Sequence, residues 1–374
     1  MSSVKKPEVS LADRWSKLWS NFLSAPRQMP SRITILDSHV LDEKYSPLTV
    51  AKDVHYFMVQ INELYLPYQS KLWVNLDPTV FIATEFKYNK QKVTVPFVVG
   101  PSMIENLQQK LPNGMIFSNT KVAGLHPYKG DTLALTIILC QASTGSTAKQ
   151  VLKMVESASG ALDYSTVLSS YLKVADVVVG GVEDLMKLNG ITPLIGLRVE
   201  FEPDVKHDLK QCYFALINKP EGTVKSEELW VKNDSLLIGV DPAIAKPLRD
   251  ADYVLYSIRG TEERDVDGLP FDSLWVRVQQ EAMQPDVSSW DRAKADMLSL
   301  FQTMYLSPDL TKQHALNLKA QREAEMKQLH DEVTVPQVTA KLSAKKKKPK
   351  NKIPEDKEII SDENLKNAAN ILNL

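Results

Sequence analysis

Two strand-like runs bracket the middle of the chain: Asp131-Thr-Leu-Ala-Leu-Thr-Ile-Ile-Leu-Cys140 and Leu194-Ile-Gly-Leu-Arg-Val-Glu-Phe201. Each run contains alternating polar and apolar residues or a continuous apolar stretch, which is typical of a strand in a protein core. Between them, apolar residues recur at helical spacing over two segments, 146–160 and 165–190, and a glycine ends each segment. The sequence therefore predicts a helical hairpin inserted between two strands of a sheet.

Strand-like runs also fill the chain on both sides of this hairpin. They are short, rich in β-branched and aromatic residues and separated by turn residues, which is typical of an antiparallel sandwich or barrel. The expected strands cover 32–36, 55–61, 71–74, 79–86, 93–99, 114–117, 211–217, 228–231, 236–238, 253–258 and 273–278, with a short helix over 102–111. The run Asp250-Ala-Asp-Tyr-Val-Leu-Tyr256 resembles the segment before a tyrosine corner in immunoglobulin-like sandwiches. The predicted class is α+β with an antiparallel β-sandwich-like body.

The C-terminal part of the chain changes to a helical pattern. Ser288 or Ser289 is placed to cap a helix that runs to Tyr305, and Pro308 begins a second helix that frays towards His330. After Thr334 the composition becomes too polar to bury a core. The predicted organisation is an N-terminal helix within 1–30, a β-rich body over 31–282 with its hairpin insert at 146–190, a helical hairpin over 286–332, and a disordered Lys-rich tail over 333–374 that ends in a short helix.

The N-terminal segment 10–24 has a strongly amphipathic pattern, with Ser10 placed to cap a helix. Its large apolar residues share one face: Leu11, Trp15, Leu18, Trp19, Phe22 and Leu23. That face must be buried on the body of this chain, on a partner, or on a membrane surface. Because Pro26 and Pro30 let the chain turn sharply back, the sequence favours docking on the body.

The composition is that of an ordinary globular protein. The 374 residues are 43% hydrophobic and 24% charged, and 45 Lys and Arg balance 46 Asp and Glu. This balance excludes a uniformly basic body built for nucleic acid, so polyanion binding would have to be local. We find neither a secretory signal nor an apolar run long enough to span a membrane, which favours a cytoplasmic protein with Cys140 and Cys212 as buried thiols.

Motifs that specify a reaction or a metal site are missing from the sequence. It contains no Gly-x-Ser-x-Gly, no His-Glu-x-x-His and no Cys-x-x-Cys, so we predict no catalytic residue, no cofactor and no metal. Asp265-Val-Asp-Gly-Leu-Pro-Phe-Asp272 begins as a calcium loop does but lacks the later ligands, which favours an acidic turn. His126 lies in an expected loop, where the fold could bring a nucleophile close to it.

The remaining pattern favours a non-enzymatic interaction or scaffold protein that recruits protein partners through its terminal segments. The residues expected to bind partners are Trp15, Leu18, Trp19, Phe22, Lys345, Lys346, Lys347, Lys348, Leu365 and Leu372. The lysine tract from Lys345 to Lys352 is open to three interpretations: an import-like signal, an electrostatic tether to a polyanion or anionic surface, or a linker. Two other functions stay open, a membrane-active or conflict-system effector that uses the 146–190 hairpin, and a hydrolase with a site near His126.

Overall fold

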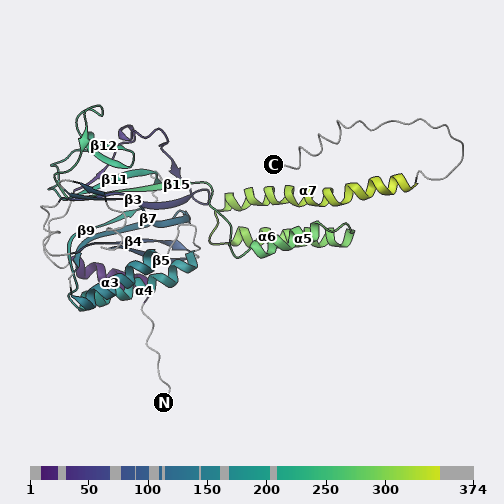
Figure 1. The fold of residues 1–374 in the computed structure, drawn as a ribbon, viewed down its shortest axis with the longest axis horizontal. Helices are drawn as coiled ribbons and strands as arrows, with labels where there is room; N and C mark the ends of the chain where they lie inside the picture. Colours follow the sequence, from purple (N-terminus) through teal and green to yellow (C-terminus); the bar gives the residue numbers. More distant parts are fainter. Residues whose placement is uncertain are drawn as a thin grey trace, which may run out of the picture.

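The computed structural model describes residues 10–23, 31–67, 77–88, 90–100, 109–111, 114–142, 145–160, 168–202 and 209–345. Antiparallel sheets and helices make the protein an α+β protein, which confirms the predicted class. Figure 1 shows the large sheets lying one over the other, helices packed beneath the lower sheet, and the helices near the C-terminus projecting from the body.

The lower sheet has four strands in the order β5 (Gln91–Val99), β4 (Asp77–Tyr88), β8 (Leu133–Ala142) and β9 (Ile191–Phe201). Strands β8 and β9 pair antiparallel from Leu133 opposite Phe201 to Ala142 opposite Ile191. The chain between them forms helices α3 (Ser146–Gly160) and α4 (Leu168–Lys187). The helical hairpin inserted between paired strands is therefore confirmed.

The upper sheet has six strands in the order β1 (Ser31–Thr34), β11 (Cys212–Ile217), β15 (Tyr253–Thr261), β3 (Tyr56–Pro67), β7 (Gly114–Pro127) and β6 (Gln109–Leu111). The short strands β2 (Thr49–Val50) and β10 (Leu209–Lys210) pair beside it. One buried cluster takes side chains from both large sheets, among them Phe57 and Ile61 of β3 and Ile137 of β8. The hydrophobic core therefore lies between the sheets.

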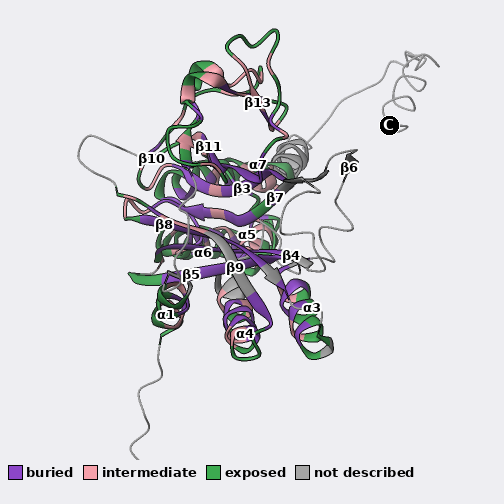
Figure 2. Cartoon of the chain, turned by 90° about the vertical axis from the view of Figure 1, so that its left-hand side faces the viewer, coloured by how far each residue is buried: buried purple, intermediate pink, exposed green. Residues whose placement is uncertain are grey.

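Each large sheet also buries its other face. Figure 2 shows α1 (Leu11–Leu23), α4 and α3 side by side under the lower sheet, where they share a second buried cluster. The outer face of the upper sheet is covered by a small sheet of β12 (Leu229–Lys232), β13 (Ser235–Ile238) and β14 (Lys246–Pro247). Asn233 and Asp234 form the β12–β13 turn with φ of 51° and 60°, the backbone that a two-residue hairpin turn requires.

The projecting group, which we call the arm, consists of α5 (Asp272–Ala282), α6 (Val287–Leu306) and α7 (Lys312–Lys345). The strand expected over Ser273–Val278 is wrong, because these residues lie in α5. The run alternates, but Phe271, Val278 and Ala282 also recur at helical spacing, and they are buried against α6 and α7. The arm is thus a three-helix unit, and its helical part begins before the expected residue 286.

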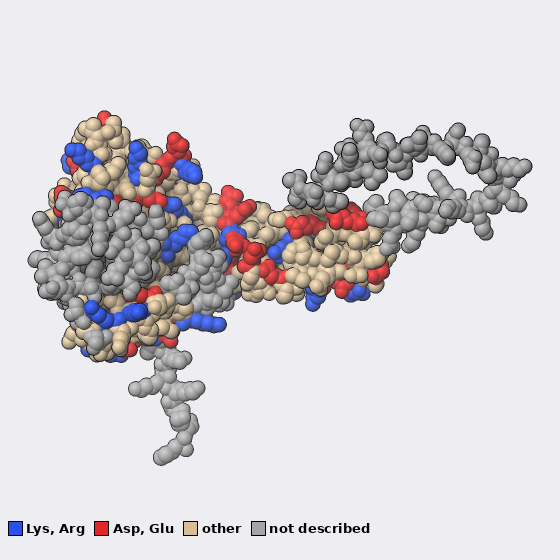
Figure 3. All heavy atoms as spheres, viewed as in Figure 1, with Lys and Arg blue, Asp and Glu red and all other residues tan. Residues whose placement is uncertain are grey.

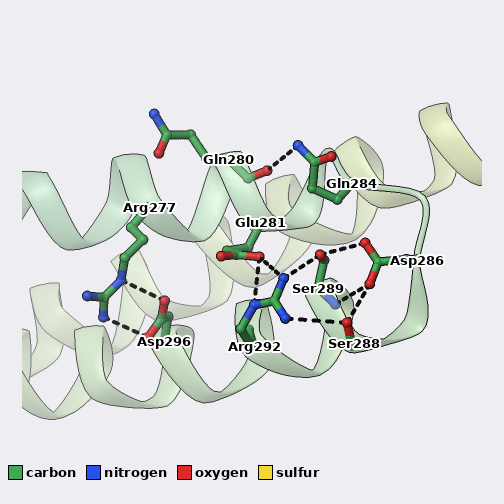
Figure 4. Close-up of polar contacts among 9 residues, drawn as sticks. All are labelled: Arg277, Gln280, Glu281, Gln284, Asp286, Ser288, Ser289, Arg292 and Asp296. Carbon is green, nitrogen blue, oxygen red and sulfur yellow. Dashed lines mark hydrogen bonds and ion pairs between the residues drawn. The ribbon is translucent and has the colours of Figure 1, made fainter.

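The ends of the arm helices also differ from the sequence expectation. The N-cap of α6 is Asp286, whose carboxylate accepts hydrogen bonds from the backbone N of Ser289 at 2.9 Å and from the hydroxyls of Ser288 and Ser289, both at 2.6 Å (Figure 4). These hydrogen bonds lower the pKa of Asp286. The serines expected as caps therefore donate to the true cap. Helix α7 begins at Lys312, not at Pro308, and continues to Lys345, past the expected end at residue 332.

Within the expected helix over 102–111, residues Gln109–Leu111 form strand β6, so that helix is wrong at its end. Residues 102–108 and the strand expected over 71–74 lie outside the described residues. The Tyr253 hydroxyl accepts a hydrogen bond from Arg249 Nη1 at 2.5 Å, and the resemblance to a tyrosine corner stays a prediction.

Candidate functional site

A polar pocket of about 570 Å³ lies on the outer face of the upper sheet, within the size range of small-ligand sites. Its floor comes from β11 and β15, and its walls come from the loop over 41–45 and the β12–β13 turn. The lining residues are Leu41, Asp42, Glu43, Lys44, Tyr45, Gln211, Tyr213, Lys232, Asn233, Asp234, Ile258 and Arg259.

A β-bulge in β3 anchors one wall of the pocket. Leu255 of β15 lies opposite Glu63, and Tyr256 lies opposite Ile61, so Asn62 is an extra residue in β3. Asn62 Nδ2 donates to Asp234 Oδ1 at 2.8 Å, and Glu63 Oε2 accepts from the backbone N of Leu236 at 2.7 Å. Both side chains are fully buried. The bulge thus lets two successive polar residues hold the β12–β13 hairpin over the sheet.

The carboxylate of Asp234 organises the floor of the pocket. Its Oδ1 accepts from the hydroxyl of Tyr213 at 2.8 Å and forms an ion pair with Arg259. Arg259 Nη2 also donates to the Tyr213 hydroxyl at 2.9 Å. Burial, together with the hydrogen bond to Asp234, raises the pKa of Tyr213, so the phenol stays protonated. The guanidinium is held in one place, and its Nη1 has no partner among the described residues.

The facing wall is tied to the hairpin by backbone and side-chain bonds. The backbone N of Leu41 donates to the carbonyl of Val231 at 2.8 Å, and the backbone N of Asn233 donates to Asp42 Oδ1 at 2.5 Å. The Tyr45 hydroxyl donates to Oδ1 of Asp37, in the short helix η1 (Asp37–His39), at 2.6 Å. Burial and this bond raise the pKa of Tyr45. The pocket is therefore shaped before any ligand arrives.

Two exposed lysines lie at the rim of this pocket. Lys44 and Lys232 are exposed, and neither forms an ion pair within the described part of the chain. Glu43 is exposed beside them. The rim therefore offers charges of both signs to a ligand, whereas Asp234 below it is already neutralised by Arg259.

The structure places the expected partner-binding residues of α1 against the body. Trp15 and Leu18 are 1% and 4% exposed and belong to the buried cluster under the lower sheet, and Trp19 is partly buried against it. This is the intramolecular docking that the sequence favours. The side chain of Phe22 lies outside the described residues. A partner could reach Trp15 or Leu18 only after α1 leaves the sheet.

The C-terminal candidates lie at or beyond the end of the described chain. Lys345 is the last residue of α7, and Lys346, Lys347, Lys348, Leu365 and Leu372 lie outside the described residues. Their roles stay predictions. On the face of the body shown in Figure 3, Lys and Arg are scattered among acidic side chains, and acidic residues gather where the arm meets the body.

His126 does not lie in a loop, as the sequence indicated, but in strand β7. Its imidazole is 1% exposed, stacks on Phe86 with ring centroids 4.8 Å apart, and contacts Phe57 edge-on. Burial and the positive charge of Arg264 lower the pKa of His126 to about 3, so the ring is neutral. It is part of an aromatic cluster between the sheets and does not line the polar pocket.

Within the described residues, no group of three or more His, Cys, Asp or Glu is placed to hold a metal ion. None of the helices, as far as they are described, is long and apolar enough to cross a membrane. Cys140 is buried, Cys212 is half-buried, and neither forms a disulfide. Comparison with protein-family models, with curated proteins and with solved structures finds no match.

Proposed function

We infer that the protein is a non-enzymatic interaction protein whose polar pocket binds a short polar segment of a partner protein. One observation carries this proposal. The groups that could act as acid or base at the floor, Asp234 and the Tyr213 phenol, already bond to each other and to Arg259, whereas the free charges stand at the rim. Such an arrangement favours holding a ligand over transforming it.

The lining of the pocket suits a peptide. Lys44 and Lys232 can meet acidic groups of a ligand, and Glu43 can meet a basic one. The rings of Tyr45 and Tyr213 lie 5.8 Å apart at 49° and supply an aromatic wall of the kind that protein interfaces favour. A peptide with mixed charges and one apolar side chain would complement all three features.

The arm supports a scaffold role because it is fixed to the body by specific contacts. The carboxylate of Asp53 forms ion pairs with Lys129 Nζ at 3.2 Å and with Lys312 Nζ at 3.1 Å. The hydroxyl of Tyr56 forms a hydrogen bond with His314 Nδ1 at 2.8 Å. Within the arm, Arg277 forms a two-bond ion pair with Asp296, both bonds at 2.7 Å (Figure 4). A rigid projection can present a second binding surface at a set distance from the pocket.

The two other functions have less support. The hairpin of α3 and α4 buries Val178, Val182 and Leu185 in this fold, so a membrane-active role would require it to leave the sheet. A hydrolase site near His126 would have to use an imidazole that is buried among aromatic rings and neutral.

Peptide selection tests the proposal. Random peptides of about twelve residues displayed on phage would be panned on the wild-type protein, and the affinity of the selected peptides measured by fluorescence anisotropy. We expect the rim variant Lys44→Glu with Lys232→Glu to bind them at least about tenfold more weakly, since it reverses both free cations.

The matched control is Lys225→Glu with Lys246→Glu, which makes the same charge change on exposed lysines that do not line the pocket. It should bind like the wild type, and both variants should melt like the wild type. Failure to enrich any peptide, or equal weakening by both variants, would refute the proposal.

A further inference from the structure

A second cavity, of about 730 Å³, lies at the edge where the two large sheets end. Strand β1 is the last strand of the upper sheet, and β9 is the last strand of the lower sheet. Arg32 and Thr34 of β1 and Phe201 of β9 all line the cavity, so it opens the space between the sheets to the outside. Its volume is that of a site for a small organic molecule.

The floor of this edge cavity is aromatic and continuous with the core. The ring of Phe214 lies 5.5 Å from that of Phe201 and stacks on Tyr256 at 5.1 Å. Leu209 adds an aliphatic wall and is 6% exposed. An apolar group of a ligand bound here would pack against the core cluster between the sheets and would be removed from water.

A guanidinium lies over this floor, and no carboxylate of the described residues forms an ion pair with it. The Cζ atom of Arg32 is 4.8 Å from the ring centroid of Phe214 and 5.4 Å from that of Phe201, within the range of cation–π contacts. Neither Arg32 nor Lys210, which also lines the cavity, pairs with a carboxylate in the described segments. Glu200, by contrast, is engaged by Arg198 at 3.1 Å. Within the described residues the cavity therefore has two unpaired cations, Arg32 and Lys210, and one unpaired carboxylate, the exposed Glu202, around an apolar floor.

We propose that the edge cavity binds an amphipathic anion: an aromatic or acyl body on the Phe201 and Phe214 floor, with a carboxylate head on Arg32. The planar fork of an arginine matches a carboxylate with two parallel hydrogen bonds, and stacking on the rings already restricts its position. Lys210 adds positive charge near the head. The apolar part of the ligand thus contacts aromatic rings, and its carboxylate contacts a cation.

Cys212 contributes to the lining and not to chemistry. Burial raises the pKa of its thiol to about 12, and its Sγ contacts the carbonyl oxygen of Lys210 at 3.3 Å. The thiol therefore stays protonated and behaves as a small apolar group at neutral pH. The proposed site is a binding site, with no covalent step.

Calorimetric titration with two pairs of probes tests the proposal. Octanoate and 2-naphthoate carry the anionic head, and 1-octanol and 2-naphthalenemethanol are their neutral counterparts. We expect the wild type to bind at least one of the anions at least about tenfold more tightly than its neutral counterpart. Whether octanoate or 2-naphthoate binds better distinguishes an acyl ligand from an aromatic one.

Three variants locate the binding. Arg32→Gln should bind the anion about as weakly as the neutral probe, and Thr34→Trp should weaken all probes by filling the cavity from the exposed side of β1. Lys173→Gln, an exposed position on α4, should bind like the wild type. Melting curves show whether each variant is folded. No binding of either anion to the wild type, equal affinity for anion and neutral probe, or unchanged binding by both cavity variants would overturn the proposal.

Discussion

Arg14 of α1 and Glu183 of α4 form a two-bond ion pair, with Nε to Oε1 at 3.0 Å and Nη2 to Oε2 at 2.8 Å. Arg14 Nη1 also donates to Asp176 at 2.6 Å. The pair lies at the rim of the contact in which α1 buries Trp15 and Leu18. Burial of the apolar face stabilises the contact between α1 and the body, and the ion pair fixes the orientation of the helix.

Replacing Arg14 by Ala should lower the free energy of unfolding by about 1–2 kcal/mol, because a bidentate pair of partly buried groups is lost. The hydrogen bonds from Arg14 lower the pKa of Glu183 below its usual 4.5. A lowered carboxyl pKa stabilises the fold above pH 4.5 and ceases to do so as pH falls through the folded-state pKa. Urea titrations should show the difference between wild type and variant shrinking with acid, and a constant difference would contradict this.

Replacing Trp15 by Ala should cost about 3–5 kcal/mol, the range for truncating a buried aromatic side chain. The matched control is Lys17→Ala on the exposed face of the same helix, which should change stability by less than about 0.5 kcal/mol. Denaturant unfolding followed by circular dichroism measures both. If the Trp15 variant unfolded at the same denaturant concentration as the wild type, α1 would not be part of the cooperative fold.

The buried His126 should make the free energy of unfolding depend on pH. Its pKa is about 3 in the folded protein against 6.5 for an ordinary histidine, so below pH 6.5 the unfolded chain binds a proton that the folded chain does not. Stability should fall with acid by up to about 1.4 kcal/mol per pH unit from this residue alone. The variant His126→Phe removes that contribution. The stability difference between wild type and variant should change by about 2 kcal/mol between pH 7 and pH 5 and be constant from pH 7 to 8.

The parts of the fold that could be predicted are those where one periodicity dominates. Strands β8 and β9 have long apolar or alternating runs, and the hairpin between them has apolar residues at helical spacing over two long segments. The Asn233–Asp234 turn could be predicted because both residues accept positive φ. The strand expected over Ser273–Val278 is wrong because this run fits either period. Its state is decided by packing against α6 and α7, which the local sequence does not contain.

The polar pocket could not be predicted because its residues are distant in the chain. Tyr213, Asp234 and Arg259 belong to three different strands or turns and meet only after the small sheet folds onto the large one. One signal was available. Asn62-Glu63 interrupts the apolar strand Tyr56–Pro67, and a polar pair inside such a run marks a bulge or a buried polar contact. The residues that Asn62 and Glu63 contact cannot be identified without the topology of the sheets.

The contact that fixes the arm to the body centres on Asp53. Asp53 has φ of 58°, its carboxylate binds Lys129 and Lys312, and its carbonyl accepts from the backbone N of Gln313 at 3.1 Å. Although burial opposes it, the hydrogen bonds from the two lysines lower the pKa of Asp53 from 3.8. Asn tolerates the same backbone, so Asp53→Asn removes the charge without straining the turn.

We expect Asp53→Asn to lose about 1–2 kcal/mol above pH 3.8 and to speed hydrogen exchange at the amide of Gln313, because the first turn of α7 loses its hold on the body. The loss should diminish as pH falls through the lowered pKa of Asp53, since protonation breaks the same ion pairs in the wild type. Asp291→Asn, which breaks an exposed ion pair with Lys294 on α6, is the control and should leave both measurements unchanged. Equal exchange at Gln313 in all three proteins would mean that the two lysines do not fix the arm.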